Sequence, residues 1–295
     1  MFSRRYHPFP LTGLRLEMDR VIVPRVVARR IALSGLRYDD ELAVKTLGAG
    51  FEGKRCRLSF VLEGSARLHA GQTAADLRPG QFFFSPDAQQ QWTQTDHLEV
   101  LELDWEPEAL ASPMASLPAH GTLGPRARAR VKEVALSLSL ARGQAPLAFA
   151  AQFPEMLEVV ASIGASVNRD FRLGEAPQPN EWLFEKVDEV LEGLDQNPQS
   201  VDLELRTGLP RQKLSRLVKD LHQRFALTGT SDSSWRSVRN FYRLLMASII
   251  LGHPEAHPAR VSRLVGFGSL EAMDHAFANS GMPTPEQLRR RIRGP

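Results

Sequence analysis

The chain has little of several things that would define its class. Cys56 is the single cysteine among 295 residues, which excludes an intramolecular disulfide and a metal site built from several cysteines. No apolar run reaches the roughly 18 residues that cross a bilayer. The first residues carry positive charge with no apolar segment behind them, unlike a secretory signal. We therefore expect a protein of the reducing cytoplasm with no membrane partner.

Motifs of common catalytic sites are missing as well. The sequence contains no G-x-S-x-G nucleophile motif, no phosphate-binding loop and no dinucleotide fingerprint. The function classes that depend on those motifs are therefore disfavoured, and we expect a protein that is not an enzyme and carries no cofactor.

Acidic residues are scarce in the last third of the chain. Residues 205–295 hold 15 Lys and Arg against 6 Asp and Glu, a balance of +9 within a chain whose net charge is +3. The remainder is accordingly acidic. A basic block behind an acidic one indicates a polyanion as the partner of the basic part, although a solvated basic face would have the same composition.

A short apolar helix interrupted by glycine occurs twice in this basic block. The first copy covers residues 203–219, where apolar residues at 203, 209, 214 and 217 can close a small core, and the second begins at Val261. Gly208 and Gly266 stand where the chain must turn with φ > 0. Each copy predicts a helix-turn-helix, and residues 235–251 between them predict a helix that holds the two units about one turn of DNA apart. One copy alone would suit an ordinary helical hairpin; two favour DNA binding.

The second helix of the first copy has an outer face that suits the DNA major groove. Lys and Arg there can neutralise phosphates or bind guanine, and Arg and Gln at its start can reach base edges. The corresponding helix of the second copy, residues 270–279, contains two acids and no Lys or Arg, so we expect the first copy to dominate. The residues that we expect at DNA are Arg211, Gln212, Lys213, Arg216 and Lys219 in the first copy, and Ser269, Leu270, Glu271 and His275 in the second.

An ordered set of motifs over residues 181–293 resembles the C-terminal DNA-binding domain of the AraC/XylS family of transcriptional regulators. Arg243-Leu244 with Ala247 and Ile250-Leu251 is similar to the family's R-L-x-x-A-x-x-L-L linker helix. The later motifs, similar to the family's G-F, A-F and S-P-x-x-Y-R, are Gly266-Phe267, Ala276-Phe277 and Thr284-Pro285 with Leu288-Arg289. The resemblance implies a double helix-turn-helix domain and a regulator that contacts promoters.

The chain also departs from that family pattern. Glu204 and Ser262 stand where a small Ala is usual, and Val218 and Met273 replace Phe. The segment 222–234 is several residues longer than the pattern requires. These departures keep open an alternative, an AraC-like interaction protein that has lost specific DNA readout and acts through subunit pairing.

Residues 40–106 have the chemistry of short strands, with turns at Gly64, Gly71 and Pro79-Gly80. The runs V-L-E-G and L-R-P-G-Q-F-F-F-S-P resemble the cupin-type sensing half that precedes many AraC-like domains. Cupin enzymes hold a metal with a H-x-H pair, a Glu and a later His. Here the first position reads K-R-C-R at 54–57 and the later one is Gln at 89–91, so we expect no bound metal.

A metal-free barrel can enclose a small-molecule effector instead, although a packed core without a cavity is equally compatible with the pattern. Because side chains alternate along a strand, half of the candidates must point away from the interior. The candidate ligand contacts are Phe60, Arg67, His69, Phe82, Phe84 and Trp92.

The sequence thus predicts an α+β fold: an N-terminal cupin-like β-barrel with following helices, and a C-terminal all-α double helix-turn-helix domain. We place the sensing and dimerisation domain at residues 1–171, a Pro- and Gly-containing linker at 172–180, and the DNA-binding domain at 181–295. Helices are expected over 126–142 and 149–167; they either pair subunits, as is common in the family, or pack on their own barrel. The expected partners are double-stranded DNA, a small-molecule effector, a second copy in a homodimer, and RNA polymerase.

Overall fold

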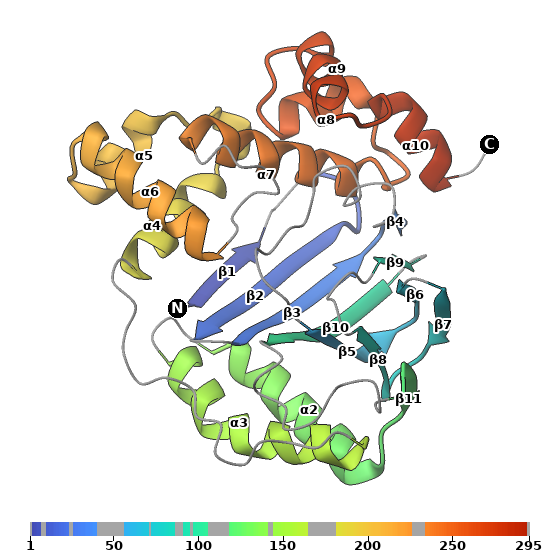
Figure 1. Ribbon diagram of the computed structural model, residues 1–295. Helices are drawn as coiled ribbons and strands as arrows, with labels where there is room; N and C mark the ends of the chain where they lie inside the picture. Colours follow the sequence, from blue (N-terminus) through green and yellow to red (C-terminus); the bar gives the residue numbers. More distant parts are fainter. Residues whose placement is uncertain are drawn as a thin grey trace. The chain divides into compact units, whose positions relative to one another are not determined.

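The computed structural model has two compact units (Figure 1). The first comprises Met1–Tyr6, Arg15–Ser34 and Gly53–Pro177, and the second comprises His7–Leu14, Gly35–Glu52 and Gln178–Pro295. The residues that the structure describes are 2–6, 10–23, 26–39, 56–70, 72–85, 91–94, 97–105, 118–140, 144–164, 181–225 and 234–293.

The first unit is built on a seven-stranded antiparallel sheet. Its strand order is β1-β2-β3-β10-β5-β8-β11, so the central strand β10 pairs with β3 on one side and β5 on the other. The strands are β1 (Phe2–Tyr6), β2 (Arg15–Val23), β3 (Val26–Ser34), β5 (Cys56–Gly64), β8 (Gln81–Ser85), β10 (His97–Trp105) and β11 (His120–Thr122).

A second antiparallel sheet contains β6 (Ala66–Ala70) paired with both β7 (Thr73–Leu77) and β9 (Gln91–Gln94). Gly64 ends β5 with φ +73°, and a Cβ there would lie 2.0 Å from the His97 carbonyl oxygen, so this turn requires glycine. The expected strands and the turns at Gly64 and Pro79-Gly80 are confirmed, while the turn expected at Gly71 lies outside the described residues. The predicted fold class, an antiparallel β half with following helices and then an all-α half, is confirmed with them.

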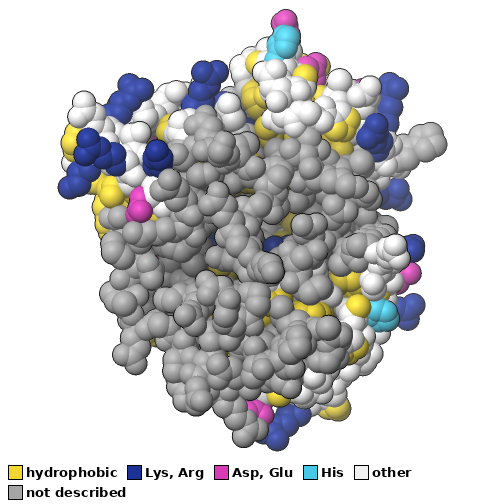
Figure 2. All heavy atoms as spheres, in the orientation of Figure 1, with side chains coloured by type: hydrophobic (Ala, Val, Ile, Leu, Met, Phe, Trp, Pro, Cys, Tyr) yellow, Lys and Arg dark blue, Asp and Glu magenta, His cyan; other side chains and the backbone are white. Residues whose placement is uncertain are grey.

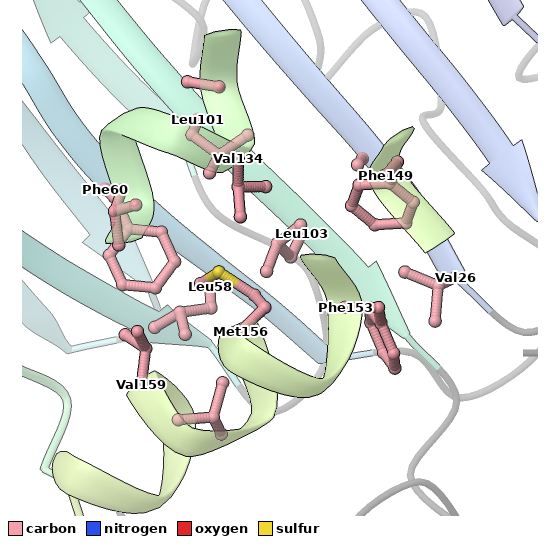
Figure 3. Packing of buried hydrophobic residues seen from close by; sticks show 14 of the residues in the cluster. Val26, Leu58, Phe60, Leu101, Leu103, Val134, Phe149, Phe153, Met156 and Val159 are labelled. Atoms are coloured by element: carbon pink, nitrogen blue, oxygen red, sulfur yellow. The ribbon is translucent and has the colours of Figure 1, made fainter. Parts of the chain in front are cut away.

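Two helices, α2 (Pro125–Leu138) and α3 (Ala145–Ser162), follow the strands and cover one face of the large sheet (Figure 1). Figure 3 shows Leu58 and Phe60 of β5 meeting Met156 and Val159 of α3 in one apolar cluster. Alternate residues of β10, Leu101 and Leu103 among them, join the same cluster. The period of two along each strand therefore directs one apolar row of the sheet onto the helices.

The opposite face of the same strands carries charge. Asp104 of β10 is fully buried and accepts from Arg29 at 2.6 Å and from Arg57 at 2.6 Å. Glu102, two residues earlier on the same face, lies 3.3 Å from Arg29. Buried charges of this kind are tolerated because each one has a partner of opposite sign.

The second unit is helical over most of its length. Besides the short strand β4 (Tyr38–Asp39) it contains α4 (Glu181–Leu191), the 3-10 helix η3 (Leu194–Gln196), α5 (Ser200–Thr207), α6 (Arg211–Phe225), α7 (Trp235–Ile250), α8 (Pro258–Leu264), α9 (Leu270–Asn279) and α10 (Pro285–Arg293). Two early segments belong to this unit, and the sequence analysis did not anticipate that. The Arg37 amide donates to the Gly252 carbonyl at 3.2 Å, and the ring of His253 lies 3.0 Å from the Thr12 carbonyl oxygen.

The apolar cluster yields a stability prediction. Phe60 is fully buried between the sheet and α3, so Phe60→Ala should lower the free energy of unfolding of the first unit by about 3–5 kcal/mol. Urea denaturation followed by circular dichroism measures the change. Leu136→Ala on the exposed side of α2 is the control and should change it by less than about 0.5 kcal/mol. Equal effects of the two substitutions would contradict this assignment of the core.

Candidate nucleic-acid interface

The first helix-turn-helix consists of α5, the turn at Gly208 and α6. Gly208 has φ +67° and its amide donates to the Glu204 carbonyl at 2.8 Å, which closes α5. The Thr207 hydroxyl donates to the Leu203 carbonyl at 2.7 Å and accepts from the Leu209 amide at 3.3 Å, so it fixes the turn. Leu203 and Leu214 are buried as expected. Leu217 is only half-buried, and its neighbour Val218 takes the inward position on α6.

The second helix-turn-helix consists of α8, the turn at Gly266 and α9. The Phe267 amide donates to the Ser262 carbonyl at 2.7 Å, and Gly266 has φ +77°. Ser262 is buried where a small residue is needed, and its hydroxyl donates to the Ala259 carbonyl at 3.0 Å. The buried serine is accommodated because its hydroxyl is hydrogen-bonded within its own helix.

Hydrogen bonds define where the last two helices begin. Ser269 caps α9 by accepting from the Ala272 amide at 3.0 Å, as expected for an N-cap serine. Thr284 and Gln287 exchange reciprocal bonds of 3.0 and 3.3 Å before α10, which is a capping box. A serine before a helix and the spacing Thr-x-x-Gln are local sequence signals of a helix start, and both signals form the expected bonds here.

The second helices of the two helix-turn-helix units, α6 and α9, differ in the charge of their outer faces. All five predicted residues of α6 are exposed, while Leu214, Val218 and Leu221 fill its inner face. On α9, Glu271 and His275 lie 3.8 Å apart with exposed side-chain fractions of 85% and 74%. Figure 2 shows Lys and Arg gathered over the α5–α6 end of this unit and over α10, whereas acidic and His side chains mark the end of α9. The α6 face can attract a polyanion and the α9 face cannot do so by charge.

One arginine of the long helix α7, Arg243, contacts both helix-turn-helix units. Arg243 is 5% exposed, and its guanidinium donates to the Asn197 side-chain oxygen just before α5. The same guanidinium stacks over the Phe267 ring of the second turn, 5.4 Å from the ring centroid. Burial, followed by repulsion from Arg239, lowers the pKa of Arg243 to about 10, so the group stays charged at neutral pH.

Two further arginines of α7 lie on the same helix face, and the sequence analysis overlooked them. Arg236 is exposed, and Arg239 is half-buried and donates to the Pro198 carbonyl at 3.0 Å. The spacing of three and four residues between Arg236, Arg239 and Arg243 was a usable signal, because such residues share one side of a helix.

The predicted ligand contacts of the first unit lie on four strands, β5, β6, β8 and β9. Phe60, Phe82 and Phe84 all belong to the apolar cluster packed on α2 and α3. Arg67 is 57% exposed and lies 3.8 Å from Asp76 on the neighbouring strand. His69 lies in β6 and Trp92 in β9, but their side chains are outside the described residues. A ligand contact for these residues stays a prediction.

Within the described ranges no group of three or more His, Cys, Asp or Glu side chains is arranged to hold a metal ion. The expectation of a metal-free protein is not tested by this. No helix in the described part of the chain is long and apolar enough to span a membrane.

Comparisons with known proteins give weak structural likenesses. No protein-family model matches the chain, and no curated protein matches it in sequence. Among solved structures, unsaturated fatty acid bound ToxT from Vibrio cholerae covers 92% of this chain and 97% of its own, at 12% identity and a TM-score of 0.36. The EutQ protein of Clostridium difficile covers 32% of this chain and 69% of its own, at 9% identity and a TM-score of 0.23. A Bacillus subtilis oxalate decarboxylase covers 36% of this chain and 28% of its own, at 13% identity and a TM-score of 0.24.

The two turn glycines make a matched pair for a stability test. Both have positive φ, but a Cβ at Gly208 would meet nothing within 4 Å, whereas one at Gly266 would lie 1.9 Å from the Leu194 carbonyl oxygen. Gly208→Ala should destabilise the second unit by about 1–2 kcal/mol from backbone strain alone, and Gly266→Ala should be clearly worse. Chemical denaturation of both variants checks the order; the reverse order would contradict the packing of η3 against the second turn.

Proposed function

We propose that this chain is a sequence-specific DNA-binding transcriptional regulator of the AraC/XylS type. The observation that carries the proposal is a pair of helix-turn-helix units held on a single helix, α7. The recognition helix of the first helix-turn-helix is basic and exposed. A helix with that outer face fits the major groove, and two units on one rigid helix suit two successive grooves.

In this proposal the first unit does not catalyse a reaction. It modulates how the helix-turn-helix units are presented to a promoter, through a small-molecule effector or through pairing with a second copy. The protein acts in the cytoplasm, as a homodimer, and contacts RNA polymerase at its promoters. Calorimetric screening of small molecules, sedimentation of the purified protein, and capture of RNA polymerase test these three partners separately.

The first prediction from this proposal concerns salt. The full-length protein should bind duplex DNA with an affinity that falls steeply as salt rises, because each phosphate neutralised by Lys or Arg contributes about −0.9 to the slope of log K against log salt. Selection of bound fragments from random DNA, followed by fluorescence anisotropy on a selected duplex, provides the measurement. Absence of binding at about 50 mM salt, or a flat salt response, would leave the interaction protein without DNA readout as the better description.

The second prediction compares the two recognition helices. Arg216→Ala should weaken binding by about 1–3 kcal/mol and relax specificity at one or two bases. Glu271→Ala should bind as well as the parent or better, because its exposed carboxylate repels phosphates and has a favourable base partner only in the cytosine amino group. Both variants are compared on one selected duplex. A larger loss for Glu271→Ala would identify α9 as the dominant recognition helix instead.

A further inference from the structure

The arginine row of α7, defined as Arg236, Arg239 and Arg243, is not explained by packing alone. Arg243 is used by the structure, since it contacts both helix-turn-helix units. Arg239 makes one hydrogen bond to a backbone carbonyl, at Pro198, and Arg236 extends the row to the exposed surface. Two long cationic side chains thus lie beside a third that is already buried.

The electrostatics of the row are unfavourable without a counter-ion. Among the described residues, none of the ion pairs brings a carboxylate to any of the three guanidiniums. Burial, followed by repulsion from Arg236, lowers the pKa of Arg239, and Arg239 in turn lowers that of Arg243. The buried Nε atoms of Arg239 and Arg243 also find no acceptor within the described part of the chain. An anion placed at the row would relieve both the repulsion and the missing acceptors.

The surface on both sides of the row is concave. One cavity, of about 320 Å³, lies toward the first helix-turn-helix and is lined by Arg211, Arg236 and Arg239, with Glu204 and Ser215 on its walls. A second cavity, of about 360 Å³, lies toward the second helix-turn-helix. It is lined by all three arginines together with His275 and Asn279 of α9. The described lining of the second cavity contains no acid and several donors, so it is the better receptor for an oxyanion.

The chemistry of guanidinium groups narrows the choice of anion. Arginine presents planar forks of N–H donors that match the oxygens of phosphate, and clustered arginines are used for that purpose in proteins. The row also lies on the helix that joins α6 and α9. A helix that connects two recognition helices in successive major grooves lies over the minor groove between them, which the two phosphodiester strands border.

We propose that Arg236 and Arg239 bind a phosphate of the DNA backbone between the two sites read by α6 and α9. The inference rests on the proposed function and adds a third contact region to it. A backbone contact of this kind carries no base information, but it fixes the register of both helix-turn-helix units on the duplex. Arg243 remains the positioning residue that holds α7 against both units.

The test uses the full-length chain with Arg236→Gln, Arg239→Gln and the double variant. Binding of each to one selected duplex and to a scrambled duplex of equal length is measured over a range of salt concentrations. The double variant should reduce the magnitude of the salt slope by about 1, the contribution of the one phosphate that is no longer neutralised, and should weaken binding to both duplexes by the same factor. Lys132→Gln, which removes one charge from the exposed side of α2, is the matched control and should leave the slope unchanged.

The remaining outcomes separate this inference from the proposed function. A parent protein that binds with a steep salt slope, together with variants that keep that slope, would overturn the phosphate contact and leave the proposed function intact. A parent that binds no duplex overturns both. Arg236 is exposed, so Arg236→Gln alone should fold as the parent does, and Arg239→Lys should retain most of the slope if charge is what matters. Calorimetry with inorganic phosphate adds a last arm: phosphate binding that Arg236→Gln abolishes, with unchanged DNA slopes, would assign the cavity to a free phosphate compound.

Discussion

The guanidinium of Arg243 is the constraint on which the helical unit depends. It donates a hydrogen bond to the side chain of Asn197, which precedes the first helix-turn-helix. It also stacks on the ring of Phe267, which lies in the second. Gly266 has no side chain next to this guanidinium, and a Cβ there would lie 3.0 Å from an Arg243 nitrogen. Because the guanidinium of Arg243 contacts both helix-turn-helix units, a rotation of either one about α7 breaks its contact with that guanidinium. The spacing of the two recognition helices is thus a property of α7 and of this residue.

A different rule governs the first unit, where alternate residues of β10 point to opposite faces of the large sheet. Leu101 and Leu103 pack on the face covered by α2 and α3, together with Phe60, Phe82 and Phe84. Glu102 and Asp104 lie on the opposite face, where Arg29 and Arg57 pair with Asp104. The buried ion pairs also restrict substitution, since the removal of one partner leaves the other charge buried and unpaired.

Sequence reasoning worked where the signal was local. Gly208 and Gly266, the Ser269 cap and the Thr284 capping box are written in short stretches, and the structure has each of them. It worked less well where a side chain's partner is distant in sequence. Strand alternation halves the set of inward residues but does not say which half faces the helices, and the structure places Phe60 in the half that packs on them. The use of residues 10–14 and 35–37 by the second unit follows from contacts more than 200 residues apart, to which no local pattern points. Arg236 and Arg239 were overlooked because their role depends on cavities formed by other helices.

If the helical unit binds DNA as proposed, the unequal charge of α6 and α9 has a consequence for the order of events in the encounter. Long-range attraction acts on the α6 side of the unit, so that side orients toward the duplex while the partners are still apart. The α9 side has no such pull and engages only after the first contact has formed, through shape and short-range bonds. The association rate is then governed by the first helix-turn-helix and is sensitive to salt. The dissociation rate is governed by the short-range contacts of the second one. The first helix-turn-helix thus mainly sets how fast the complex forms, and the second mainly sets how long it lasts.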